Sequence, residues 1–121
     1  MSPTGVNIPM QATPRKVINY TLPDGREPLK EWLYAMKDYN GQDKIIRRLE
    51  RIEQGNLGKT RRVGEGVLEL KINVGPGYRV YVGLDGQLLV VLLCGGDKHT
   101  QERKDIETSR LYWADYKSRK G

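Results

Sequence analysis

Residues 64–98 limit the folds open to this chain more than any other stretch does. Apolar side chains alternate with other residues in VLELKI and again in YRVYVGL, which is the pattern of half-buried strands. The intervening NVGPG and the later LDG contain the Pro, Gly and Asp-Gly residues that are typical of tight turns. The apolar run from Leu88 to Cys94 indicates a central strand between two neighbours. The stretch therefore predicts three strands of an antiparallel sheet.

Antiparallel pairing of the first two of these strands brings polar side chains onto one face. They are Glu69, Lys71, Arg79 and Tyr81, and Lys98 follows the third strand at the edge of the same face. Cations held this close together repel one another, so we expect an anion to bind among Lys71, Arg79 and Lys98. This basic and aromatic face is where we expect the function to lie.

The rest of the pattern predicts one more strand and three helices. A short β-prone run lies at 16–21, and Pro28 opens a helix that is expected to end near Asn40 and Gly41. A second helix is predicted for about 42–54 and a last one for about 101–117. Because few residues join the first two helices, we expect them to form an antiparallel hairpin. The order β-α-α-β-β-β-α predicts an α+β domain with a small antiparallel sheet, an N-terminal helical hairpin and a C-terminal helix.

The length of 121 residues favours one domain. The first 14 residues carry three prolines and no charge, so we expect residues 1–14 to be a flexible extension and 15–121 to be the domain. The core of this domain is predicted to include Leu33, Met36, Leu49, Leu70, Val80, Val82, Val91 and Leu93.

The charge balance is basic, with 21 Lys and Arg against 15 Asp and Glu, for a net charge of +6. Such a domain often binds nucleic acid or an acidic protein, although the same charge also serves solubility alone. No run approaches the length of a membrane span, and the single cysteine, Cys94, permits no internal disulfide. These features lead us to expect a cytoplasmic protein.

A basic loop is predicted for residues 55–64, before the sheet. It carries Lys59, Arg61 and Arg62, which either contact phosphates or are simply solvated. One histidine and one cysteine in the whole chain do not make a zinc site, so no metal and no cofactor is expected.

Longer motifs add a resemblance to a known family. The run G-x-G-V-L-E-L-K-I-x-x-G-P-G-Y-R-V-Y is followed by L-L-C-G-G-D-K-x-T-Q, then by D-I and Y-W-x-D-Y. Together, over roughly residues 16–117, these motifs resemble the addiction-module killer proteins, which are toxins of type II toxin–antitoxin systems in the RelE/ParE superfamily. The resemblance implies a compact sheet with two N-terminal helices packed against it.

Two activities occur in that superfamily. The RelE-like branch cleaves messenger RNA, often on the ribosome, without a metal ion, and the ParE-like branch inhibits DNA gyrase. The resemblance also implies a cognate antitoxin, often a helix-turn-helix protein, whose complex with the toxin binds operator DNA. We therefore expect a metal-independent endoribonuclease, with a gyrase inhibitor or an inactive antitoxin- and operator-binding module as the alternatives.

The resemblance assigns roles to particular side chains. Arg79 matches the arginine after Gly-Tyr, and its guanidinium is suited to stabilise the developing phosphorane charge, unless it forms a structural ion pair with Glu69. Lys71 matches a lysine of the preceding strand and is a candidate base, whereas Glu69 stands where the pattern has a second lysine. Lys98 and His99 are further catalytic candidates because RelE-like toxins carry basic residues there.

Two more residues are expected to bind the nucleic acid. Tyr81 lies on the same predicted strand face as Arg79 and is a candidate for stacking on a base, unless it is packed within the protein. Arg103, on the last predicted helix, faces solvent or a partner.

Overall fold

The order of elements along the chain confirms an α+β domain and adds one strand to the prediction. The structure is a computed structural model that describes residues 13–120, so the greater part of the predicted extension, residues 1–12, lies outside the described residues. The elements are β1 (Lys16–Asn19), α1 (Pro28–Ala35), α2 (Tyr39–Glu53), β2 (Arg61–Gly64), β3 (Val67–Ile72), β4 (Tyr78–Asp85), β5 (Leu89–Asp97) and α3 (Glu102–Lys120). Within this part of the chain, no helix is long and apolar enough to cross a membrane.

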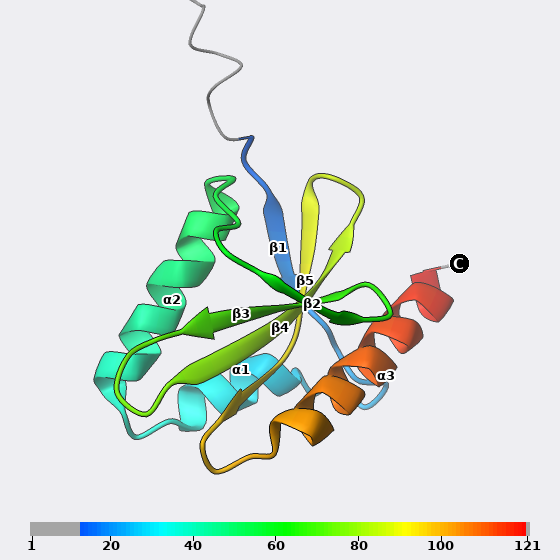
Figure 1. Cartoon of the computed structure of the whole chain (residues 1–121). Coiled ribbons are helices and arrows are strands. Elements are labelled where there is room, and N and C mark those ends of the chain that lie inside the picture. The colour runs from blue at the N-terminus through cyan, green and yellow to red at the C-terminus, as the bar shows by residue number, and fades with distance from the viewer. Residues whose placement is uncertain (1–12, 121) are drawn as a thin grey trace, which may run out of the picture.

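The strands form one sheet in the order β1-β5-β4-β3-β2 (Figure 1). The apolar strand β5 lies between β1 and β4, as its sequence predicted. Pairing is antiparallel from β2 through β5, but β1 pairs with β5 in parallel, so the sheet is mixed and not purely antiparallel. The extra strand β2 lies in the predicted basic loop, because Arg61 and Arg62 pair with Glu69 and Leu68 of β3.

The boundary between the first two helices differs from the prediction. Asn40 and Gly41 do not end α1; they lie in the first turn of α2. The reason is the side chain of Asp38, which caps α2 by accepting a hydrogen bond from the Gly41 N–H at 3.0 Å. The link between the helices is therefore residues 36–38, and Gly55, with φ +96°, follows α2 as predicted.

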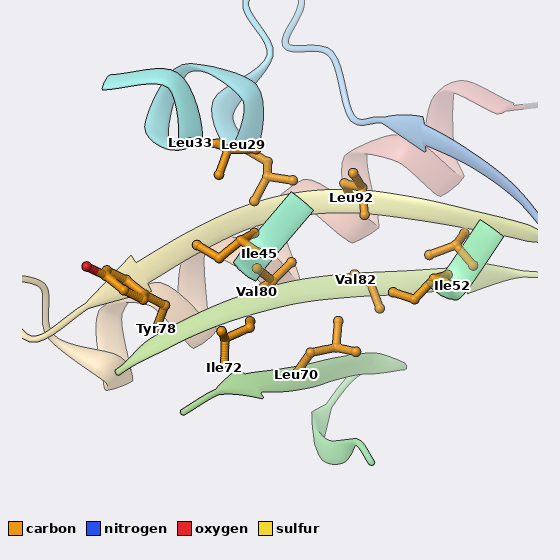
Figure 2. Packing of buried hydrophobic residues seen from close by; sticks show 11 residues of the cluster. Leu29, Leu33, Ile45, Ile52, Leu70, Ile72, Tyr78, Val80, Val82 and Leu92 are labelled. Atoms are coloured by element: carbon orange, nitrogen blue, oxygen red, sulfur yellow. The ribbon is translucent and has the colours of Figure 1, made fainter. Parts of the chain in front are cut away.

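The first face of the sheet carries the larger core (Figure 2). Leucine and isoleucine side chains of α1 and α2 pack there on alternate residues of β3, β4 and β5, such as Leu70, Val80 and Leu92. Of the predicted core residues, Met36 and Leu49 are only partly buried at its margin, whereas Leu33, Leu70, Val80, Val82, Val91 and Leu93 are buried.

The second face is covered by α3 and has a core of its own. Trp113 and Tyr81 are buried there with Val91, Leu93 and Cys94. Leu93 and Cys94 are adjacent in sequence, yet both belong to this core. The pairing of β4 with β5 shifts its register between Tyr81 and Val82, so that Leu93 is an extra residue in β5. On the predicted polar face, Glu69 and Tyr81 are buried, Arg79 is partly buried and Lys71 is exposed.

Candidate functional site

Lys71 and Arg79 lie directly opposite each other on β3 and β4, as their sequence positions predicted. Their surroundings differ. Lys71 is exposed, whereas only 17% of the Arg79 side chain is exposed. The strand phase was therefore predicted correctly, but the two cations do not share one open surface.

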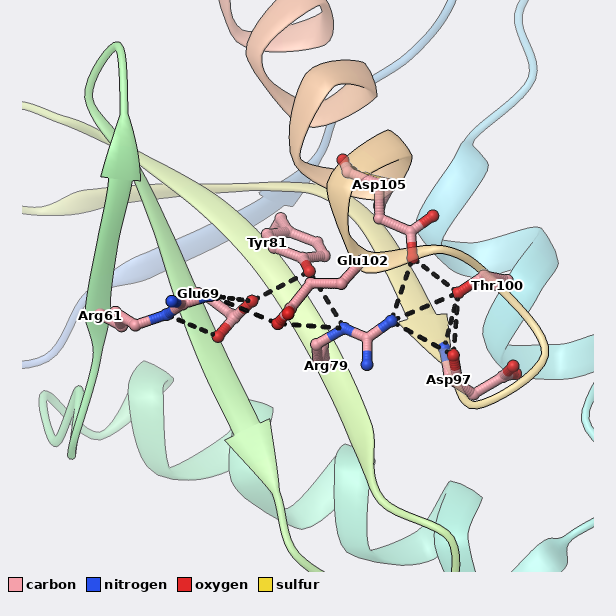
Figure 3. A network of polar contacts seen from close by, with 9 residues as sticks. Arg61, Glu69, Arg79, Tyr81, Asp97, Thr100, Glu102 and Asp105 are labelled. Carbon is pink, nitrogen blue, oxygen red and sulfur yellow. Dashed lines mark hydrogen bonds and ion pairs between the residues drawn. The ribbon is translucent and has the colours of Figure 1, made fainter.

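Arg79 is surrounded by acceptors from β5, α3 and the turn between them (Figure 3). Its Nη2 lies 3.2 Å from both Asp105 Oδ2 and the Asp97 carbonyl oxygen, and its Nε lies 3.1 Å from the Tyr81 hydroxyl. Glu102 Oε2 is 3.9 Å from the same Nε. Arg79 is therefore not a free cation in this structure, since Asp105 and Glu102 already pair with its guanidinium.

The ion pair with Glu69 that was the structural alternative for Arg79 is made by Arg61 instead. Arg61 donates from Nε and Nη2 to the two carboxylate oxygens of Glu69 at 3.1 and 3.2 Å. The Tyr81 hydroxyl donates to Glu69 Oε2 at 3.0 Å. Burial acts to raise the pKa of Glu69, but the hydrogen bonds from Arg61 and Tyr81 outweigh it and lower the pKa below its usual value. Glu69 is therefore a buried, paired carboxylate.

Tyr81 is fully buried, which corrects the expectation that it stacks on a nucleotide base. Its ring belongs to the core beneath α3, and its hydroxyl joins Arg79 to Glu69. Burial, together with the charge of Glu69, raises the pKa of Tyr81, so that the hydroxyl stays protonated and donates.

The basic surface of this protein lies instead between α2 and the β2–β3 end of the sheet. Two adjoining grooves of about 660 and 470 Å³ run there and share Arg48, Arg51 and Lys71. We call them together the basic groove. Its cationic lining is Lys44, Arg47, Arg48, Arg51, Lys59, Arg61 and Lys71, and its acidic lining is Glu50 and Glu69.

Within the described part of the chain, most of these cations have no carboxylate partner. Among the ion pairs of residues 13–120, Arg47 pairs with Asp43 and Arg61 with Glu69 and Glu102. The other lining cations form none within that range; they are Lys44, Arg48, Arg51, Lys59 and Lys71. A concave surface with unneutralised cations is suited to bind a polyanion.

Arg48 also builds the groove. It donates to the carbonyl oxygens of Leu57 and Lys59 at 2.7 and 2.9 Å, and so fixes the loop before β2 against α2. Burial, and next the charge of Arg51, lower the pKa of Arg48. The charges of Arg48 and Arg51 therefore repel each other across the groove wall in the protein without a ligand.

The remaining predicted residues lie away from the basic groove. Lys98 and His99 are exposed in the turn after β5, where the structure forms no charged contact for them among the described residues. Arg62 is exposed on β2, and Arg103 pairs with Glu107 on the surface of α3. Of the predicted set, the structure brings only Lys59, Arg61 and Lys71 to the groove.

No role was predicted for the α2 cations Lys44, Arg47, Arg48 and Arg51. Their signal was present, because the apolar positions of α2 leave an arginine-rich opposite side. What the pattern did not reveal is that this side faces Lys71 across a groove.

Within residues 13–120, no three His, Cys, Asp or Glu side chains are placed so as to hold a metal ion. No protein-family model matches the sequence. A protein of Haemophilus influenzae described as "Uncharacterized protein" is 45% identical over 80 residues, which are 66% of this chain and 80% of that relative.

Proposed function

We propose that this chain, which belongs to the same family as that Haemophilus influenzae protein, is the toxin of a type II toxin–antitoxin system and cleaves messenger RNA without a metal ion. The proposal joins the resemblance to the RelE/ParE superfamily with one observation of the structure. That observation is the basic groove, whose cations Arg48, Arg51, Lys59 and Lys71 have no carboxylate partner within the described chain.

RNA fits such a groove because its backbone carries a regular series of phosphates that unpaired cations neutralise. The two adjoining grooves offer room for a length of single strand, with Lys71 where they meet. Release of bound counterions from the strand then supplies much of the binding free energy.

Cleavage of RNA without a metal proceeds by attack of a 2′-hydroxyl on the adjacent phosphorus. The bond from phosphorus to the 5′-oxygen breaks, which leaves a 2′,3′-cyclic phosphate and a 5′-hydroxyl. A base takes the proton of the 2′-hydroxyl, and an acid gives one to the leaving oxygen. Lys71 is our first candidate for proton transfer or charge stabilisation, since it is exposed and borders both grooves.

The experiment compares cells expressing the wild type, Lys71→Ala or Lys30→Ala. Lys30, on α1, is an exposed lysine that lines neither part of the basic groove. We expect the wild type and Lys30→Ala to stop protein synthesis and to create new 5′-hydroxyl ends in messenger RNA, and Lys71→Ala to do neither. Intact messenger RNA in cells arrested by the wild type would contradict the proposal.

One observation favours the second candidate function, inhibition of DNA gyrase without catalysis. Arg79, the best catalytic candidate of the motif, is neutralised by Asp105 and Glu102. A protein that acts by binding alone needs no free catalytic arginine. This reading predicts DNA damage signalling and filamentation on expression, with messenger RNA left intact.

The same proposal covers the partners and the compartment. We expect the toxin to act in the cytoplasm and to be neutralised by a cognate helix-turn-helix antitoxin, whose complex with it binds operator DNA. An acidic antitoxin segment would compete with RNA for the basic groove, so its association should slow as salt rises. An association rate unchanged by salt would contradict that electrostatic competition.

A further inference from the structure

Glu102 lies between two arginines that come from opposite sides of β3 (Figure 3). Its Oε2 is 3.3 Å from Arg61 Nη2 and 3.9 Å from Arg79 Nε. One carboxylate oxygen thus bridges a guanidinium that lines the basic groove and a guanidinium that lies deeper, beside α3.

Glu102 is held less firmly than the other two carboxylates. Its distance to Arg79 is 3.9 Å, whereas Asp105 lies 3.2 Å from the same guanidinium. Asp105 is 16% exposed and also accepts from the Thr100 hydroxyl at 2.6 Å, whereas 43% of the Glu102 side chain is exposed. Glu69 is buried and accepts three hydrogen bonds, two from Arg61 and one from Tyr81. Of the three carboxylates around these arginines, Glu102 is the one that is easily removed.

Its position in α3 allows that removal. Glu102 is the first residue of the helix, so its side chain turns outward without disturbing the packing of Trp113 further along. An exposed ion pair contributes little to stability, so its loss costs the fold little.

We infer that Glu102 occupies the position of a nucleic-acid phosphate, and that a phosphate group of the RNA displaces it from Arg61 and Arg79. A phosphodiester resembles a carboxylate in charge and in offering two acceptor oxygens, and guanidinium groups bind both. The inference rests on the proposed function, because the basic groove must first bring the RNA to Arg61. Arg79 can then bind the substrate once Glu102 has moved away, and Glu102 competes with the substrate for both arginines.

The test measures binding of a short single-stranded RNA whose riboses are 2′-O-methylated, so that no cleavage interferes. Glu102→Gln removes the competing charge. Glu107→Gln is the matched control, since it removes the same charge from an exposed ion pair with Arg103 on the same helix. At low salt we expect Glu102→Gln to bind about three- to fivefold more tightly than Glu107→Gln, the factor set by an exposed ion pair. The advantage should shrink in an Arg61→Ala background, because Glu102 then blocks Arg79 alone.

The outcomes separate the two claims. Equal affinities of Glu102→Gln and Glu107→Gln, with clear binding by the wild type, would overturn the displacement and leave RNA binding intact. An advantage that survives Arg61→Ala in full would also overturn it. Absence of RNA binding by every variant would overturn the proposed function, and this inference with it.

Discussion

Lys71 and Arg79 are direct partners across β3 and β4, yet only Arg79 is bound to carboxylates within the described chain. The first turn of α3 causes the difference, because it brings Glu102 and Asp105 over Arg79 and leaves Lys71 at the groove. Two neighbouring cations therefore have different tasks: Arg79 ties α3 to the sheet, and Lys71 faces the space where we expect RNA.

Replacing Arg79 should cost stability as well as activity. In Arg79→Ala, Asp105 loses its guanidinium partner while remaining mostly buried. Thr100 still donates to this carboxylate, but the loss of its cation should lower the free energy of unfolding by about 1–3 kcal/mol. Urea denaturation checks this, with Lys104→Ala as the control for loss of an exposed cation on α3. Equal free energies of unfolding for the two variants would show that the contacts of Arg79 do not stabilise the fold.

Glu69 should make the protein sensitive to acid. Its pKa is lowered in the folded state from an ordinary value of 4.5, so its contribution to stability is present above that value and is lost as pH falls through the folded pKa. Glu69→Gln lacks this contribution. The stability difference between the wild type and Glu69→Gln should therefore shrink on going from about pH 6 to about pH 3. A difference that stays constant over that range would contradict the lowered pKa.

Cys94 should be unreactive in the folded protein. It is buried beneath α3, and burial raises the pKa of its thiol to about 12. A disulfide reagent at about pH 8 should modify it only after denaturant is added, because the thiolate is the attacking species. Rapid modification of the native protein would mean that α3 opens readily.

Gly83 should tolerate no side chain. The ring of Trp113 lies directly over it, and a methyl group at this position would collide with that ring. We expect Gly83→Ala to lower the free energy of unfolding by about 1–3 kcal/mol through overpacking. The same change in a Trp113→Leu background should cost clearly less. An equal loss of stability in both backgrounds would show that the strain does not come from the contact with Trp113.

The fold was largely predictable because the signals are local. Alternation in VLELKI and YRVYVGL gave the correct faces, and the uniformly apolar β5 was correctly placed between two neighbouring strands. The extra strand β2 was missed, since its sequence, RRVG, has charged residues where a strand pattern needs apolar ones. It forms a hairpin with β3 across Glu65 and Gly66, and its Arg61 side chain pairs with Glu69 of β3.

The site was harder to predict, because it depends on contacts between elements that are far apart in the sequence. Alternation places Tyr81 and Arg79 on one face, but it does not say that α3 covers Tyr81 and brings Asp105 to Arg79. Likewise, the polar side of α2 reads as an ordinary solvated face until the fold sets it opposite Lys71. Charge at a site depends on which elements meet, and that is decided by tertiary structure.

The most direct test of the account is the salt dependence of RNA binding by the wild type, Arg51→Ala and Lys30→Ala. For single strands the logarithm of the binding constant falls against the logarithm of salt with a slope of about −0.7 per neutralised phosphate. Arg51 lines both parts of the basic groove and Lys30 lines neither. We predict that Arg51→Ala weakens binding and makes the slope shallower by about 0.7, whereas Lys30→Ala changes neither. No binding by the wild type, or the same slope for wild type and Arg51→Ala, would contradict the claim that this groove receives RNA.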